Sequence, residues 1–66
     1  MLIHVNGESR EVAEEIYLAQ LVATLELKPE QVAIELNKSV VRRVNWDATR
    51  LHDGDRIEIV HFVGGG

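Results

Sequence analysis

Cysteine is absent from this chain of 66 residues, and aromatic residues are scarce, with one Trp, one Tyr and one Phe. The lack of cysteine excludes disulfide bonds, thiolate metal sites and cysteine nucleophiles. Basic residues are also few, since seven Lys and Arg against eleven Asp and Glu give a net charge of −4. This balance argues against nonspecific binding to nucleic acid or to anionic membranes, so we expect neither as a partner.

Long apolar runs are missing as well. The most apolar window, residues 16–27, is interrupted by Gln20, Thr24 and Glu26 and is too short to cross a bilayer. The opening MLIHVNGESR lacks the basic start and apolar stretch of a signal peptide. We therefore expect a cytoplasmic protein with one small domain, which has little core from which to build an active-site cleft of its own.

Residues that could do chemistry do not form a recognisable set. Strand alternation places His4 and His61 on opposite faces of a sheet, and His52 in a turn, so three unrelated histidines are favoured over a zinc site. Hydroxyl residues that we expect to bond to the backbone are Ser9, Thr24, Ser39 and Thr49. No glycine-rich loop opens a helix, so the chain is not expected to bind ATP or another cofactor by itself.

The first half of the chain predicts a hairpin and a helix. A strand over 2–5 enters an Asn6-Gly7 turn, the strongest short hairpin signal, and returns over 9–12. The helix is indicated by an apolar stripe at i, i+3, i+4 and i+7, formed by Leu18, Leu21, Val22 and Leu25. Tyr17 occupies its N-cap position, Gln20 suits a capping box, and Lys28-Pro29 should mark its exit.

The second half predicts three more strands. Alternation indicates a half-buried strand over 32–36, a turn at Asn37-Lys38 and a short strand over 39–41. Residues 42–51 show no clean period and predict an irregular crossing with at most one short turn, in which Trp46 covers the rim of the core. The last strand is predicted over 56–63, with Ile57 and Ile59 inward.

This order of elements predicts an α+β protein of the β-grasp fold. One helix must cover one face of one mixed sheet of about four to five strands, because no other element is available to bury that face. The first and last strands would lie parallel at its centre. The predicted domain spans residues 1–63, and residues 64–66 form a flexible glycine tail.

The closing VHFVGGG favours a working C-terminus. Gly64 and Gly65 lack a Cβ and can enter a channel too narrow for side chains, and three extended residues reach roughly 10 Å. The terminal carboxylate of Gly66 is ionised at neutral pH and is nucleophilic toward an activated phosphate. Ordering such a tail costs about 1–2 kcal/mol per residue. A docking patch is therefore needed, and outward Val60 and Phe62 are its candidates.

The segment DGDRIEIVHFVGGG, with Trp46, Thr49 and Leu51 upstream, resembles the ThiS family, the sulfur carriers of thiamine biosynthesis. LIHVNGE and VAIELN also match, so the resemblance covers nearly the whole chain. It implies a ubiquitin-like fold and adenylation of Gly66 by a ThiF-like adenylyltransferase that uses ATP and Mg²⁺. A cysteine desulfurase or another donor would then supply sulfur for a thiocarboxylate, and a ThiG-like thiazole synthase would receive it. The chain would be a carrier and not an enzyme.

Other readings of the tail are a MoaD-like small subunit of molybdopterin synthase, a protein modifier that forms isopeptide bonds through Gly66, and a plain β-grasp binding module.

The chain also departs from the ThiS pattern at three places. Arg42-Arg43-Val44 replaces a common Pro-Arg-Ser stretch, Lys38 replaces a common Gly, and Tyr17 replaces a common Thr or Ser. These departures fall in a crossing loop, a turn and a helix cap, outside the tail.

Overall fold

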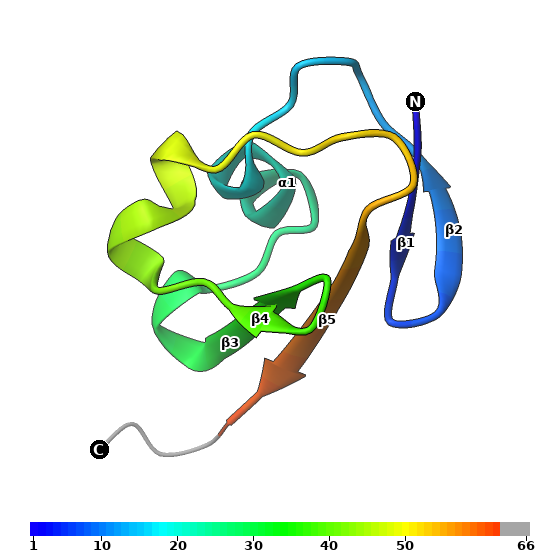
Figure 1. Ribbon diagram of the computed structural model, residues 1–66. Helices are drawn as coiled ribbons and strands as arrows, with labels where there is room; N and C mark the ends of the chain where they lie inside the picture. Colours follow the sequence, from blue (N-terminus) through cyan, green and yellow to red (C-terminus); the bar gives the residue numbers. More distant parts are fainter. Residues whose placement is uncertain (63–66) are drawn as a thin grey trace.

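A single five-stranded sheet with one α-helix on one face forms the body of the protein (Figure 1). The computed structural model describes residues 1–62. The strands are β1 (Leu2–Val5), β2 (Glu8–Glu11), β3 (Val32–Leu36), β4 (Ser39–Val40) and β5 (Arg56–His61), and the helices are α1 (Leu18–Thr24) and the 3₁₀ helices η1 (Pro29–Gln31) and η2 (Arg43–Ala48). The sheet order is β2-β1-β5-β3-β4, in which β1 and β5 are parallel and the other neighbours are antiparallel. The predicted β-grasp arrangement is confirmed.

The hairpin of β1 and β2 turns at Asn6-Gly7, as predicted. Both residues have positive φ, 50° and 83°, which a two-residue type I′ turn requires. This turn pairs Val5 with Glu8, so β2 begins one residue earlier than the predicted 9–12 strand and ends at Glu11. Val12 lies beyond the strand and still pairs with Met1, because its N–H donates to the Met1 carbonyl at 2.9 Å and its carbonyl accepts from the Met1 ammonium at 2.8 Å.

Helix α1 begins as predicted but ends sooner. The Tyr17 N–H donates to Gln20 Oε1 at 2.8 Å, which gives Gln20 its expected capping role. At the other end Glu26 adopts φ 59°, and the Leu27 and Glu26 N–H groups donate to Val22 and Ala23 carbonyls at 3.1 and 3.0 Å. This Schellman closure ends the helix before Pro29 is reached, so the predicted exit at Lys28-Pro29 was too late. Pro29 instead opens η1.

The core lies between α1 and the sheet. Its buried side chains are Ile3, Leu18, Leu21, Val22, Val32, Ile34, Trp46, Leu51, Ile57 and Ile59. Trp46 lies deeper than the rim position that we expected, with 3% of its surface exposed, and its Nε1 donates to the Val41 carbonyl at 2.9 Å. It is carried by η2, a more regular element than the expected irregular crossing.

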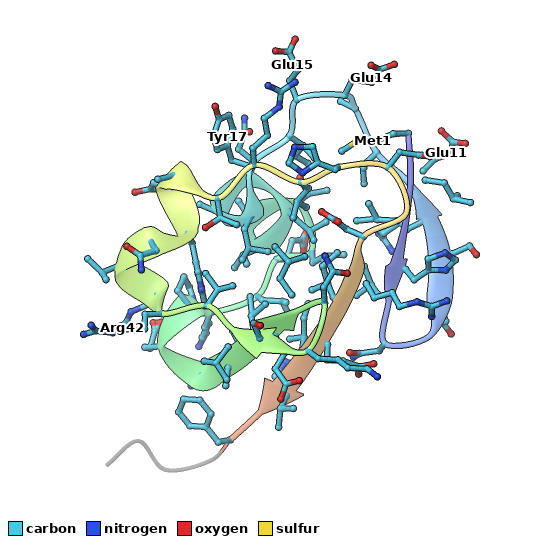
Figure 2. All side chains as sticks on the ribbon, viewed as in Figure 1. Met1, Glu11, Glu14, Glu15, Tyr17 and Arg42 are labelled. Atoms are coloured by element: carbon cyan, nitrogen blue, oxygen red, sulfur yellow. The ribbon has the colours of Figure 1, made fainter. Side chains whose placement is uncertain are left out.

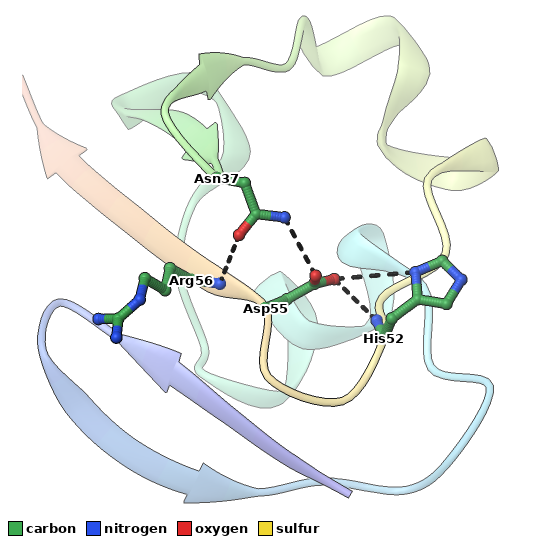
Figure 3. A network of polar contacts seen from close by, with 4 residues as sticks. All are labelled: Asn37, His52, Asp55 and Arg56. Atoms are coloured by element: carbon green, nitrogen blue, oxygen red, sulfur yellow. Dashed lines mark hydrogen bonds and ion pairs between the residues drawn. The ribbon is translucent and has the colours of Figure 1, made fainter.

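A polar network joins the turn between β3 and β4 to the start of β5 (Figure 3). Asn37 and Lys38 have φ 51° and 74°, so the predicted turn is present. Asn37 Nδ2 donates to Asp55 Oδ1 at 3.1 Å, and Asn37 Oδ1 accepts the Arg56 N–H at 3.0 Å. The other Asp55 oxygen accepts the His52 N–H at 2.7 Å. These bonds fix where β5 enters the sheet.

The last two predicted strands differ slightly from those observed. β4 ends at Val40 rather than at Val41, although the Val41 N–H still donates to the Ile34 carbonyl at 2.9 Å. β5 runs to His61. The final predicted strand residue, Val63, and the predicted tail 64–66 lie outside the described residues, so the domain boundary at residue 63 stays a prediction.

Candidate functional site

The predicted docking pair lies at the C-terminal end of β5. Val60 is 58% exposed and Phe62 is 46% exposed, whereas Ile57 and Ile59 are buried beneath the helix. Because strand side chains alternate between faces, Val60 and Phe62 project from the face of the sheet that α1 does not cover. Val60 is directly opposite Ala33 of β3. Both side chains are exposed, and their role in docking stays a prediction.

Phe62 fixes the chain at the point where the predicted tail follows. Its N–H donates to the Gln31 carbonyl at 3.0 Å, which holds the end of β5 against η1. Its side chain also lines a groove that includes Pro29, Val40, Arg43 and Trp46. The predicted tail residues Gly64, Gly65 and Gly66 lie outside the described residues. They follow this anchored residue after one further position.

The sequence analysis did not predict two features of this outer face of the sheet. Val40 of β4 is 70% exposed and lies opposite Glu35, which in turn lies opposite Glu58 of β5. Alternation alone puts both glutamates outward, but only the strand register shows that they face each other. Like charges directly opposite each other destabilise a sheet. The outer face thus combines apolar residues with a pair of acids, and basic side chains of a partner would reduce the repulsion between these acids.

Three other acidic residues are remote from this surface. Figure 2 shows Glu11, Glu14 and Glu15 at the end of the molecule opposite the exit of β5. The Met1 ammonium donates to the Val12 carbonyl at 2.8 Å and lies 3.8 Å from Glu11. Glu11 is 83% exposed, so this ion pair contributes little to stability, and it does not belong to the candidate site.

Within residues 1–62, the remaining chemical candidates form no catalytic arrangement. Thr24 and Thr49 hydroxyls donate to the Gln20 and Asn45 carbonyls at 2.9 and 2.7 Å, the backbone role that was predicted. Ser9 was expected to do the same, but its Oγ lies 3.5 Å from His4 Nδ1 on the surface. No orienting carboxylate bonds to His4 within residues 1–62.

The histidines of the described residues do not gather with other potential metal ligands. His61 ends β5 in phase with Ile57 and Ile59, yet it is exposed. No group of three or more His, Asp or Glu residues within the described part is placed to hold a metal ion. Among the described helices, none has the length and apolar character needed to cross a bilayer.

Comparison with known proteins decides the family. The ThiS family model matches residues 3–66. The chain belongs to the ThiS family. The crystal structure of the thiamine biosynthesis protein ThiS from Geobacter metallireducens superposes on this chain with a TM-score of 0.87 and 39% identity, over the whole of both chains. The sulfur carrier protein ThiS of Bacillus subtilis is 41% identical over 49 residues, which is 74% of each chain. The resemblance carried by the IEIV strand, Trp46 and the glycines is confirmed.

A second kind of relative is much longer. A thiazole synthase of Magnetococcus marinus is 46% identical over 66 residues, which is all of this ThiS-family chain and 20% of that protein. The chain therefore spans about a fifth of the length of this relative. In that organism a ThiS-like segment is part of the same polypeptide as the thiazole synthase.

Proposed function

We propose that this ThiS-family chain carries sulfur as a thiocarboxylate on Gly66 and donates it to thiazole formation for thiamine. The observation that carries the proposal is that the family match runs through Gly66. The carboxylate oxygen attacks the α-phosphate of ATP, and pyrophosphate leaves. Hydrosulfide then attacks the acyl carbon of the adenylate, and AMP leaves with the former carboxylate oxygen. A persulfide donor instead forms an acyl disulfide, which a thiol reduces to release the thiocarboxylate. Since the adenylate is made in another protein's site, this chain acts as a carrier and not as an enzyme.

The folded body contributes binding free energy. Ordering residues 63–66 in a partner's channel costs about 1–2 kcal/mol per residue, and glycines offer no side chains to offset that cost. Burial of apolar surface stabilises a complex by about 25 cal/mol per Å². Val60 and Phe62, exposed beside the tail, are the side chains that supply this term.

The proposed partners are those that membership of the ThiS family implies. A ThiF-like adenylyltransferase supplies the site for ATP and Mg²⁺, and a cysteine desulfurase or another donor supplies sulfur. A ThiG-like thiazole synthase receives the sulfur. Support for this last partner comes from the Magnetococcus thiazole synthase, which includes a ThiS-like segment. Because the proposed activation consumes ATP, we propose that the chain acts in the cytoplasm.

Mass spectrometry of the intact chain tests the proposal. The chain is incubated with a ThiF-like enzyme, ATP, Mg²⁺ and a sulfur donor, and the mass change of one oxygen-to-sulfur exchange at the C-terminus is the expected result. A chain that lacks Gly65 and Gly66 is the matched control and stays unchanged. Absence of exchange, with an enzyme that charges its own cognate carrier under the same conditions, contradicts the proposed function.

A further inference from the structure

The two backbone edges of β5 serve different neighbours. Arg56 and Phe62 bond toward β3, through the Asn37 carboxamide and the Gln31 carbonyl respectively. The carbonyls of Asp55 and Ile57 point the other way and accept the His4 and Asn6 N–H groups of the β1 side, both at 2.9 Å. In β5, even-numbered residues thus bond toward β3 and odd-numbered residues toward β1.

On the side of β5 that faces β1, the backbone groups have hydrogen-bond partners only as far as Ile59. Strand β1 ends at Val5, and the chain leaves the sheet through the Asn6-Gly7 turn. The Asn6 carboxamide takes the place of one more strand residue. Its Oδ1 accepts the Ile59 N–H at 2.7 Å, and its Nδ2 donates to the Ile59 carbonyl at 3.2 Å.

His61 is the next residue of β5 whose backbone faces this side. It is opposite Val32 in the register, in a pair that exchanges no hydrogen bonds, because the bonded pairs are those in phase with Gln31–Phe62. Within residues 1–62, no group beyond the Asn6 side chain continues the β1 side of the sheet. The N–H and C=O of His61 therefore form an open strand edge, flanked by exposed Val60 and Phe62.

We propose that the enzyme that receives the Gly66 carboxylate adds an extended segment of its own chain to β5 at His61. This inference rests on the proposed function, which requires the residues after Phe62 to enter an enzyme in extended form. An enzyme strand added here continues the sheet past the hairpin. It would direct the residues after Phe62 toward the enzyme's channel. Since the glycines offer no side chains, backbone hydrogen bonding is the recognition available next to them. Val60 or Phe62 would lie under the added segment.

Hydrogen exchange of individual amides tests the proposal without altering the chain. In the free protein the His61 amide should exchange rapidly, whereas the Phe62 amide, bonded to Gln31, should be protected. On saturation with a ThiF-like enzyme in the absence of ATP, the His61 amide should become protected by about tenfold or more. A His61 amide that exchanges as fast in the complex as in the free chain overturns the proposal.

Substitution of the donor gives a second test. His61→Pro removes the N–H without removing a bond to β3, and His61→Ala is the control for the side chain. We expect about tenfold weaker binding for H61P and less than about twofold for H61A. Equal affinities for the two variants contradict the proposal. If H61P loses Phe62 protection, a chemically synthesised chain with an ester in place of the His61 amide replaces it and should show the same loss.

The outcomes separate this inference from the proposed function. If the native chain acquires sulfur but His61 stays unprotected in the complex, the added strand is wrong and the carrier function stands. If no sulfur is acquired, the carrier function fails whatever His61 does. Concentration-dependent protection of His61 without enzyme would identify a second copy of the chain as the occupant, and would contradict the assignment to the enzyme.

Discussion

The Asn6 carboxamide makes both backbone hydrogen bonds of Ile59, at 2.7 Å to the N–H and 3.2 Å to the carbonyl. The two residues are 53 positions apart, so this contact ties the first turn of the chain to the last strand. Asn6 also holds φ 50°, a conformation that asparagine tolerates better than most residues. One side chain thus forms the hairpin turn and positions the part of β5 that leads to the docking residues.

Loss of the Asn6 carboxamide should destabilise the fold. Asn6→Gly keeps the positive φ but removes both bonds and leaves part-buried backbone groups unpaired, so we expect a loss of about 1–3 kcal/mol in the free energy of unfolding. Asn6→Ala should lose more, because Ala is strained at φ 50°. Urea unfolding measures both. Equal stability of N6G and the native chain would mean that the bonds to Ile59 contribute nothing.

Glycine should give a more stable fold than the native residue at two positions, the helix end at Glu26 and the turn at Lys38. Both residues have positive φ, 59° and 74°. Glu26→Gly and Lys38→Gly relieve this strain and should each raise the free energy of unfolding by about 1 kcal/mol. Lys28→Gly is the matched control at an ordinary φ of −89° and should not stabilise. Thermal unfolding of the three variants checks the prediction, and destabilisation by E26G would contradict it.

Truncation of the exposed apolar residues beside the tail should weaken partner binding without weakening the fold. Val60→Ala and Phe62→Ala remove side chains that are 58% and 46% exposed, so stability should change little. Affinity for a ThiF-like enzyme should fall by about tenfold for F62A and less for V60A. Val44→Ala, at a residue 75% exposed on η2, is the control. Calorimetric titration that shows V44A and F62A binding alike would remove Phe62 from the docking surface.

The Glu35–Glu58 pair should contribute to partner choice rather than to stability. Glu58→Gln removes the repulsion across β3 and β5, and the free energy of unfolding should rise by about 0.2–1 kcal/mol. If the enzyme presents Lys or Arg to this pair, E58Q should bind more weakly at low salt and should lose that difference at high salt. Glu14→Gln, at the end of the molecule opposite the exit of β5, is the control for overall charge. Tighter binding of E58Q at low salt would contradict the role of the acids.

Much of the fold was predictable because local signals agreed with it. Asn6-Gly7 marks the hairpin, and the inward alternation of Ile57 and Ile59 marks the central strand. The end of α1 was not predictable, since a glutamate occupies a left-handed position that usually signals itself as glycine.

Some features of the candidate site could likewise be predicted from the sequence, and others could not. Outward Val60 and Phe62 follow from alternation along one strand. The Glu35–Glu58 pair and the bonds of Asn6 to Ile59 depend on the register between distant segments, which no local pattern encodes. The open edge at His61 has the same origin, because it exists only where β1 stops short of the end of β5.

The most direct test of the carrier account is to extend the chain by one bulky residue, such as Trp, after Gly66. The extended and native chains are incubated with a ThiF-like enzyme, ATP and a sulfur donor, and their affinities for the enzyme in the absence of ATP are measured in parallel. The account predicts oxygen-to-sulfur exchange in the native chain and none in the extended chain, since Gly66 then has no free carboxylate. Sulfur acquisition by the extended chain at the native rate would contradict it.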